Sequence, residues 1–221
     1  MFALASLLRS RRRFVDVGAN IGIYSYFFSR CFDRVVSFEP IPNVAYRLGS
    51  LKISTVETFQ IGLSNTEGNF DLYIPKFEHA INTQLASLED RGGEIETIKV
   101  DVRTLDSFNY QDVDLLKIDV EGHESAVIQG AERTIQECRP ALLVEIEQRH
   151  IQNDIANVFS QVMMLDYAGF FLLEGRLRPI SEFRYELHQQ PFLSDVMSKA
   201  YVNNFIFVPK SGYLHRKIGL D

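Results

Sequence analysis

The chain has 221 residues, of which 46% are hydrophobic, so it is long enough to bury a full core as one domain. Its net charge of −6 argues against a nucleic-acid partner, because phosphate backbones require a basic face. The two cysteines, Cys31 and Cys138, lie far apart, and no stretch approaches the ~20 apolar residues of a membrane span, so we expect a cytoplasmic protein without a transmembrane segment.

The N-terminal segment, residues 1–13, contains the densest basic cluster, Arg9 and Arg11 to Arg13. We interpret it as a short, solvated basic tail. The apolar residues come before the arginines, which is the reverse of the order in a secretory signal. The abrupt start leaves two alternatives, a minimal domain or the loss of an N-terminal element. Residues 14–221 are predicted to form a single domain.

The remaining apolar segments alternate between strand-like and helix-like periodicity. Strands are predicted at 14–17, 35–39, 56–61, 113–118, 141–146, 169–174 and 204–208, and helices at 22–30, 42–51, 123–137 and 153–167. Such alternation predicts an α/β fold with a parallel sheet covered by helices on both faces. The pattern breaks at about 62–112, where runs at 70–74 and 97–100 predict extra strands. We interpret this region as a β insertion within the domain.

The first predicted strand leads into the sequence FVDVGANIG at 14–22. A buried strand, a turn with Gly18 and Gly22, and a helical pattern form the first unit of a nucleotide-binding sheet, with the ligand over the turn. A Cβ at these glycines would collide with the ligand or forbid the backbone angles. Glu39 ends the second strand 21 residues after Gly18, close to the ~20 expected for an acid that binds ribose hydroxyls.

The details of this turn select the cofactor. Asn20 stands where a dinucleotide site has its second glycine, and the turn contains no lysine or arginine. Asp16 would repel a pyrophosphate and attract a cation. S-adenosylmethionine suits both ends, because it offers ribose hydroxyls to Glu39 and an ammonium and a sulfonium to Asp16. We therefore predict that Asp16, the Gly18–Gly22 turn with Asn20, and Glu39 bind this cofactor. A purely structural turn is the alternative.

A second group of polar residues follows the fourth predicted strand. Asp119 ends the strand, Glu121 lies in a turn, and a helix begins near His123. Ligands of open α/β sheets bind outside the carboxyl ends of the strands, so these side chains should face the same crevice as Gly18. They could bind a cationic methionine moiety, position a hydroxyl or accept its proton. Compensation of the helix dipole is the alternative role for Glu121.

The fifth predicted strand ends at Glu145 and Glu147, which alternate faces. Together with His150 and Asp119 they could ligate Mg²⁺ or another divalent ion. No tight ligand spacing supports a metal, and solvated polar residues at a strand end are the favoured interpretation.

These motifs occur in a characteristic order. They are FVDVGANIG at 14–22, FEP at 38–40, TLD at 104–106, LKIDVEGHE at 116–124, QGA at 129–131, RPALLVE at 139–145 and NFIFVP at 204–209. In this order the chain resembles the FkbM family of S-adenosylmethionine-dependent methyltransferases. The resemblance implies a three-layer, Rossmann-like sheet of order 3-2-1-4-5-7-6 with strand 7 antiparallel. It also implies O-methylation, often of a sugar hydroxyl in a glycan, glycolipid or natural product.

We therefore expect in-line transfer of a methyl group from S-adenosylmethionine to a hydroxyl of a small-molecule or glycan acceptor. Asp119 or Glu121 is predicted to accept the hydroxyl proton, with His123 as the second choice. Gly62 and Ser64, after the third strand, are predicted to lie near the adenine.

Two regions, 62–112 and 175–203, are expected to contact the acceptor. The second has little periodicity, and it is either a lid or binding segment, or else disordered or plain surface. Two rival functions remain open at this point. One is a nicotinamide-dependent oxidoreductase, and the other is a scaffold or accessory subunit that binds the cofactor without catalysis.

Overall fold

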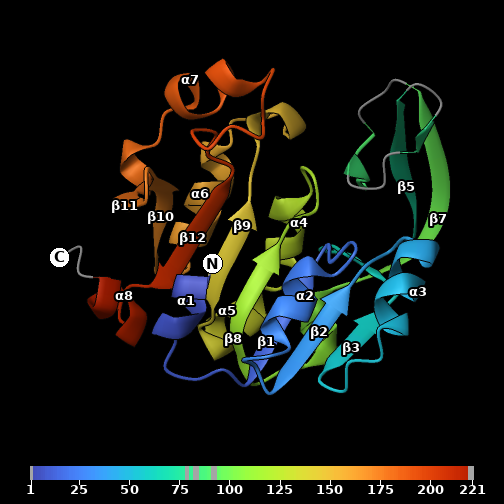
Figure 1. Ribbon diagram of the computed structural model, residues 1–221, viewed down its shortest axis with the longest axis horizontal. Coiled ribbons are helices and arrows are strands. Elements are labelled where there is room, and N and C mark those ends of the chain that lie inside the picture. Colours follow the sequence, from blue (N-terminus) through green and yellow to red (C-terminus); the bar gives the residue numbers. More distant parts are fainter. Residues whose placement is uncertain (1, 78–79, 82–84, 91–93, 219–221) are drawn as a thin grey trace.

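The computed structural model of the protein describes residues 2–77, 80–81, 85–90 and 94–218. Its main sheet has eight strands in the order β11-β10-β12-β9-β8-β1-β2-β3 (Figure 1). The parallel strands are β1 (Arg13–Val17), β2 (Arg34–Phe38), β3 (Val56–Phe59), β8 (Val113–Ile118) and β9 (Ala141–Glu145).

The far half of the sheet contains the antiparallel strand. β12 (Asn204–Pro209) pairs antiparallel with β9 and with β10 (Tyr167–Leu173). This confirms the predicted order 3-2-1-4-5-7-6 with strand 7 antiparallel. A further strand, β11 (Arg176–Pro179), pairs with β10 at the edge of the sheet.

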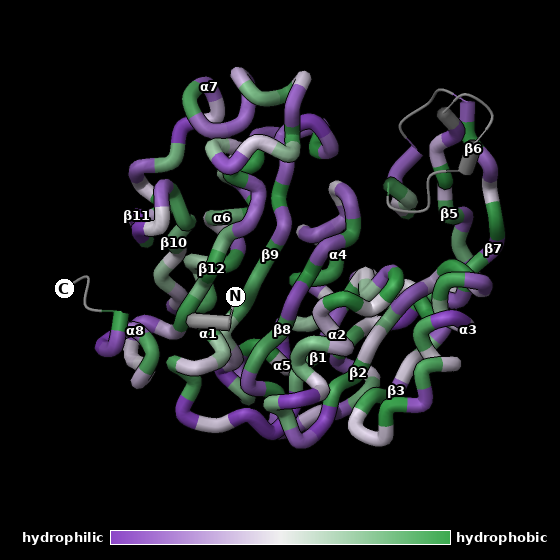
Figure 2. Tube along the Cα trace, viewed as in Figure 1, coloured by the Kyte–Doolittle hydropathy of each residue, from purple (hydrophilic) through white to green (hydrophobic). Residues whose placement is uncertain are grey.

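The central strands are apolar because helices cover both faces of the sheet. All of β1 and the first four residues of β9 are buried, and Figure 2 shows β9 and β12 largely in the hydrophobic colours. Two charged residues interrupt this core, Asp16 in β1 and Lys117 in β8, which are 0% and 2% exposed. Buried charges require partners, and these two contribute to the site described below.

The connections between strands are mostly helical. The helices are α2 (Ile23–Phe28), α3 (Pro42–Ser50), α4 (Glu124–Gln129), α5 (Glu132–Cys138), α6 (Ala156–Met163) and α8 (Tyr213–Ile218), with short 3₁₀ turns η2 (Leu105–Phe108) and η3 (Gln148–His150). The helix predicted at 123–137 is in fact divided at Gly130. A Cβ there would lie 1.9 Å from the carbonyl oxygen of Ser64, so glycine permits the close approach of the two segments.

The N-terminal segment is only partly the solvated tail that its composition suggested. It contains the helix α1 (Phe2–Leu7), whose Leu4 and Ala5 are buried in a cluster with β1 residues. Arg13 is also buried, and its Nε lies 2.6 Å from Asp112 Oδ1. The exposed stretch is confined to Arg9–Arg12. The prediction of a solvated tail was therefore wrong for α1 and for Arg13. It rested on the arginines, which dominate the composition, and overlooked the preceding apolar residues, which bury surface.

The predicted β insertion is a second, smaller sheet of order β4-β7-β5-β6. Its strands are β4 (Gly62–Leu63), β5 (Gly68–Phe77), β6 (Ala80–Ile81) and β7 (Ile95–Arg103). We call residues 62–103 the insertion. It projects beside α3 (Figure 1), where Leu72 and Val102 form a small core with Ile41 and Val44. The insertion therefore has its own packing against the main domain.

The segment 175–203 forms regular elements, which disagrees with disorder, one of the alternatives left open by the sequence. It contains β11, η4 (Ile180–Glu182), α7 (Tyr185–His188) and η5 (Gln190–Phe192). Fully buried Gln189 donates to the carbonyls of Ile146 (2.8 Å) and Val202 (2.9 Å) and accepts from the Gln148 N–H (2.9 Å). These bonds attach the segment to the chain that follows β9, and α7 lies above that end of the sheet in Figure 1.

Cys31 and Cys138 are free thiols. Within the described ranges, none of the helices combines the length and the apolarity needed to cross a bilayer.

Candidate functional site

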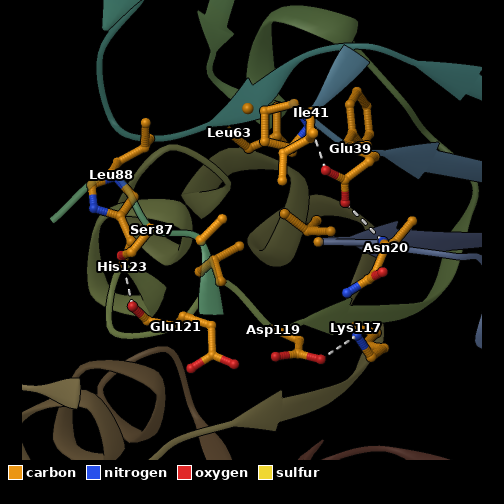
Figure 3. A pocket seen from close by; sticks show the side chains of 18 of the residues that line it. Asn20, Glu39, Ile41, Leu63, Ser87, Leu88, Lys117, Asp119, Glu121 and His123 are labelled. Carbon is orange, nitrogen blue, oxygen red and sulfur yellow. Dashed lines mark hydrogen bonds and ion pairs between the residues drawn. The ribbon is translucent and has the colours of Figure 1, made fainter. Parts of the chain in front are cut away.

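A cavity lies at the carboxyl ends of β1, β2 and β8, on the side of the sheet where parallel α/β folds bind ligands. Its wall brings together most of the predicted site residues, namely Gly18, Asn20, Glu39, Gly62, Asp119, Glu121 and His123. Figure 3 shows how the labelled side chains surround it. The other three predicted residues, Asp16, Gly22 and Ser64, contact other parts of the protein instead.

The turn after β1 uses its backbone amides within the protein. The N–H groups of Gly18 and Ala19 both donate to the Phe38 carbonyl. The Asn20 N–H donates to the Glu39 carboxylate, and the Ile21 N–H donates to the Asn20 side-chain oxygen. The Gly22 N–H donates to the Ala19 carbonyl. The amides of the turn itself are therefore engaged within the protein and help to fix its conformation.

The two glycines of the turn are required by the protein itself. Gly18 has φ +73°, and a Cβ there would lie 1.8 Å from the carbonyl oxygen of Asp119. Gly22 has φ +81°, and its Cβ would lie 2.2 Å from Leu48 Cδ1 of α3. The sequence analysis gave two reasons for these glycines, the backbone angles and a collision with the ligand. The positive φ values agree with the first, and the collision would be with the neighbouring backbone and with a packed helix.

Glu39 forms the wall at the end of β2. Its Oε2 accepts the Asn20 N–H (2.8 Å), and its Oε1 accepts the Ile41 N–H (2.9 Å). Burial raises the pKa of Glu39 to about 7, although the two backbone bonds act in the opposite direction. The two bonds fix the carboxylate, whose remaining lone pairs can accept hydroxyl protons from a ligand in the cavity.

A buried ion triad links β1 to β8. Lys117 Nζ lies 3.0 Å from Asp119 Oδ2 and 3.6 Å from Asp16 Oδ1, while Asp16 Oδ2 accepts a 2.6 Å hydrogen bond from Ser25. Burial raises the pKa of Asp16 against the opposing effect of Lys117. Burial by itself would lower the pKa of Lys117, but Asp119 and Asp16 outweigh it and raise that pKa. Asp119 is the member of the triad whose carboxylate reaches the cavity.

Glu121 extends the same wall beyond Asp119. Its backbone has φ +52°, a strained conformation for a residue with a side chain. The Ser87 hydroxyl of the insertion donates to the Glu121 carbonyl at 2.7 Å, which helps to hold this turn. Glu121 Oε2 is in close contact with His150 Nδ1, from η3 after β9. The Glu121 carboxylate is therefore oriented by an imidazole from a distant part of the chain.

His123 joins three parts of the structure. Its Nδ1 lies 2.7 Å from Glu89 Oε1 of the insertion, and its Nε2 lies 2.9 Å from the Ser64 hydroxyl. Ser64 was predicted to lie near adenine, but it is 4% exposed and contacts this imidazole. Because both ring nitrogens have partners, His123 is placed to position the wall rather than to exchange protons with a ligand.

Glu145 and Glu147 have different surroundings. Glu145 lines the cavity, and its Oε1 accepts a 2.7 Å hydrogen bond from Asn203. Burial and the nearby charge of Asp119 raise the pKa of Glu145 to about 9, so it is protonated at neutral pH. Glu147 instead contacts Arg149 and Tyr201. Within the described part of the chain, no group of three or more His, Cys, Asp and Glu side chains is arranged to hold a metal ion.

Sequence reasoning missed several residues of this wall. Lys117 has a recognisable signal, since a lysine inside an otherwise apolar strand must have buried partners. Glu145 was considered as a metal ligand and, preferably, as a solvated residue at a strand end. The insertion contributes Leu72 and the residues Ala86, Ser87 and Leu88, for which the sequence offers no motif.

Comparison with known proteins agrees with this geometry. The methyltransferase FkbM domain matches residues 16–172. Methyltransferase sdnD of Sordaria araneosa is 29% identical over 168 residues, which cover 59% of this chain and 64% of that protein. The hexuronic acid methyltransferase AglP of Haloferax volcanii is 30% identical over 152 residues, which cover 67% of this chain and 62% of that protein.

The fold is also shared with a solved structure. The crystal structure of methyltransferase FkbM from Methylobacillus flagellatus KT superposes with a TM-score of 0.57 at 19% identity, covering 90% of this chain and 43% of that chain. The chain thus spans less than two thirds of the length of each of these relatives.

Proposed function

The chain belongs to the FkbM methyltransferase family, and from that premise we propose that it is an O-methyltransferase that uses S-adenosylmethionine. Its acceptor is a hydroxyl group of a sugar, glycan, glycolipid or natural product. The observation that carries this proposal is the single cavity that places Glu39 at one end and the Asp119–Glu121 wall at the other. We also propose a cytoplasmic location, on the basis of the two free cysteines.

The groups in the cavity fit S-adenosylmethionine better than a dinucleotide. Glu39 presents carboxylate oxygens that suit ribose hydroxyls, and Asp119 presents a negative charge that suits an ammonium or sulfonium. Asn20 stands where a dinucleotide site has the second glycine that lets the pyrophosphate approach the backbone. When bound, the cofactor supplies an electrophilic methyl group on a good leaving group. Most of the catalysis can then come from positioning.

The protein must still remove a proton from a weakly acidic hydroxyl. We assign this role to Glu121, with Asp119 as the alternative. Lys117 lies 3.0 Å from Asp119 and holds that carboxylate in an ion pair. Glu121 instead pairs with His150, an imidazole that can share the incoming proton. His123, whose two nitrogens are engaged, is assigned a positioning role.

A carbohydrate acceptor is supported by one relative. AglP is described as a hexuronic acid methyltransferase, so a protein 30% identical to this chain acts on a sugar derivative. We extend to this chain only the carbohydrate class. A natural-product acceptor remains the second candidate.

Binding and transfer assays test the proposal in two steps. In calorimetry and thermal-shift assays, S-adenosylhomocysteine should stabilise the protein by about 2.7 kcal/mol at a ligand concentration 100 times Kd. NAD⁺ should not stabilise it. Methyl transfer is then measured with labelled cofactor against sugars, glycolipids and polyols. Binding of S-adenosylhomocysteine without transfer to any acceptor would favour the scaffold alternative. Stabilisation by NAD⁺ alone would exclude the cofactor assignment.

A further inference from the structure

Negative charge is concentrated at one end of the cavity. The Asp119 and Glu121 carboxylates line it beyond the end of β8. Among the lining residues of the described chain, Lys117 is the only lysine or arginine, and it is engaged by Asp119 and by buried Asp16. The Arg149 guanidinium, which follows β9, is held by Glu147. Among the described lining residues, the one Lys or Arg side chain is therefore already paired with carboxylates.

The hydrogen-bonding groups at this end are mainly acceptors. The Ser87 hydroxyl already donates to the Glu121 carbonyl, and both nitrogens of His123 have partners. Asp119 and Glu121 remain as carboxylates, which accept hydrogen bonds and do not donate them. A hydroxyl group can donate to such a wall, whereas a carboxylate or phosphate group can only accept and would also be repelled. Protonated Glu145 can donate one hydrogen bond, but it brings no positive charge.

We propose that the acceptor is an uncharged polyhydroxyl compound, and that the Asp119–Glu121 wall rejects acceptors with an anionic group beside the reacting hydroxyl. This inference rests on the proposed methyltransferase function. AglP, by contrast, is described as a hexuronic acid methyltransferase. The two proteins would share cofactor chemistry and differ in the charge of the acceptor.

Matched acceptors test the inference directly. Methyl β-glucoside and methyl β-galactoside are compared with the corresponding uronides, in which a carboxylate replaces the terminal CH₂OH, with labelled cofactor at pH 7. We expect kcat/KM to favour each neutral member by at least about 10-fold, the scale for two carboxylates about 8 Å apart at an effective dielectric constant near 20. Equal or preferred use of the uronides would overturn the inference.

A binding control separates this result from a failure of the proposed function. If S-adenosylhomocysteine does not bind, the proposed function itself fails. If S-adenosylhomocysteine binds and neither neutral sugar is methylated, the polyhydroxyl acceptor class is wrong, and the inference falls with it.

A charge-introducing variant sharpens the test. Leu88 lines the cavity from the insertion, on the same side as Ser87 and His123 in Figure 3, and it has no part in the proposed chemistry. Leu88→Lys should raise the relative use of the uronides by about 10-fold, because it adds an ammonium at the wall. Leu88→Gln is the matched neutral control and should leave the ratio unchanged. An identical ratio in wild type and Leu88→Lys would contradict electrostatic exclusion.

Discussion

At the Glu39 end of the cavity, both carboxylate oxygens accept backbone N–H groups, from Asn20 and Ile41. At the Asp119–Glu121 end, side chains from separate parts of the chain hold the wall. Ser87 reaches it from the insertion, and His150 reaches it from η3. The first end is built from backbone and short-range contacts, and the second from long-range side-chain contacts. The first therefore suits a ligand of fixed structure, and the second can differ between relatives with different acceptors.

This contrast predicts different consequences of mutation at the two ends. Changes in the turn after β1 should affect folding or cofactor affinity, because that turn packs directly on β8 and α3. Changes at Glu121, in the Asp119–Glu121 wall, should affect turnover and acceptor choice while the cofactor still binds. The four substitutions below test the contrast.

Gly18→Val should have the largest effect. The added Cβ would lie 1.8 Å from the Asp119 carbonyl oxygen, and φ of +73° disfavours a β-branched residue. We expect the free energy of unfolding to fall by at least about 4 kcal/mol, measured by urea denaturation, or no folded protein at all. Gly49→Ala is the control, because the space around a Cβ at this α3 glycine is empty. Normal stability of Gly18→Val would show that the turn can move away from β8.

Glu121→Gln should lower turnover by about 10²–10⁴-fold, the usual contribution of a general base. The affinity for S-adenosylhomocysteine, measured by calorimetry, should change by less than about 3-fold, because Glu121 belongs to the acceptor end. Glu132→Gln, in the first turn of α5, is the exposed control. A parallel loss of affinity would instead make Glu121 a cofactor ligand. Full activity would transfer the role of base to Asp119.

The same contrast explains what the sequence could predict. Periodicity predicted the alternation of strands and helices, and the resemblance to the FkbM family implied the strand order. Glu39 was predicted from its spacing of 21 residues after Gly18 within one β-turn-α-β unit, and its contacts come from Asn20 and Ile41 in that unit. Local patterns of this kind remain visible in a single sequence.

The acceptor end could not be predicted in the same way. The partners of Glu121 and Glu145 lie on the insertion, on η3 and beside β12, and no motif links those segments. Asp16 shows the opposite case, in which a local pattern suggested a contact that the packing of the chain does not allow. Its position just before the turn suggested a ligand contact, but the alternation of side chains in β1 and the pairing with Lys117 place it in the core.

Glu39→Ala should weaken binding of S-adenosylhomocysteine by about 1.5–3 kcal/mol, the range for loss of charge-assisted hydrogen bonds. Isothermal titration calorimetry measures this change. Glu57→Ala, an exposed position in β3, is the matched control and should bind as the wild type does. Unchanged affinity in Glu39→Ala would remove Glu39 from the cofactor site. The Glu39 end of the cavity could then no longer be assigned to the cofactor.

The smallest effect concerns Glu124, the first residue of α4, at the base of the Asp119–Glu121 wall. Its Oε1 accepts the Gly122 N–H at 2.8 Å, and its buried Oε2 is without a hydrogen-bond partner in the described structure. Burial raises the pKa of Glu124 from 4.5 to about 7. The unfolded chain therefore releases this proton at lower pH than the folded chain does. Stability should fall as pH rises from about 4.5 to 7, by up to about 1.4 kcal/mol per pH unit.

Glu124→Gln should remove this dependence, because glutamine does not ionise. We expect the variant to exceed the wild type by about 1–2 kcal/mol in free energy of unfolding at pH 8, and to lie about 1 kcal/mol below it at pH 5. The gain is below the full linkage value because the glutamine amide adds an unpaired buried donor. Urea denaturation at the two pH values measures the difference. If the two proteins keep parallel pH profiles, Glu124 ionises at an ordinary pKa, and the wall is more accessible to water than its burial indicates.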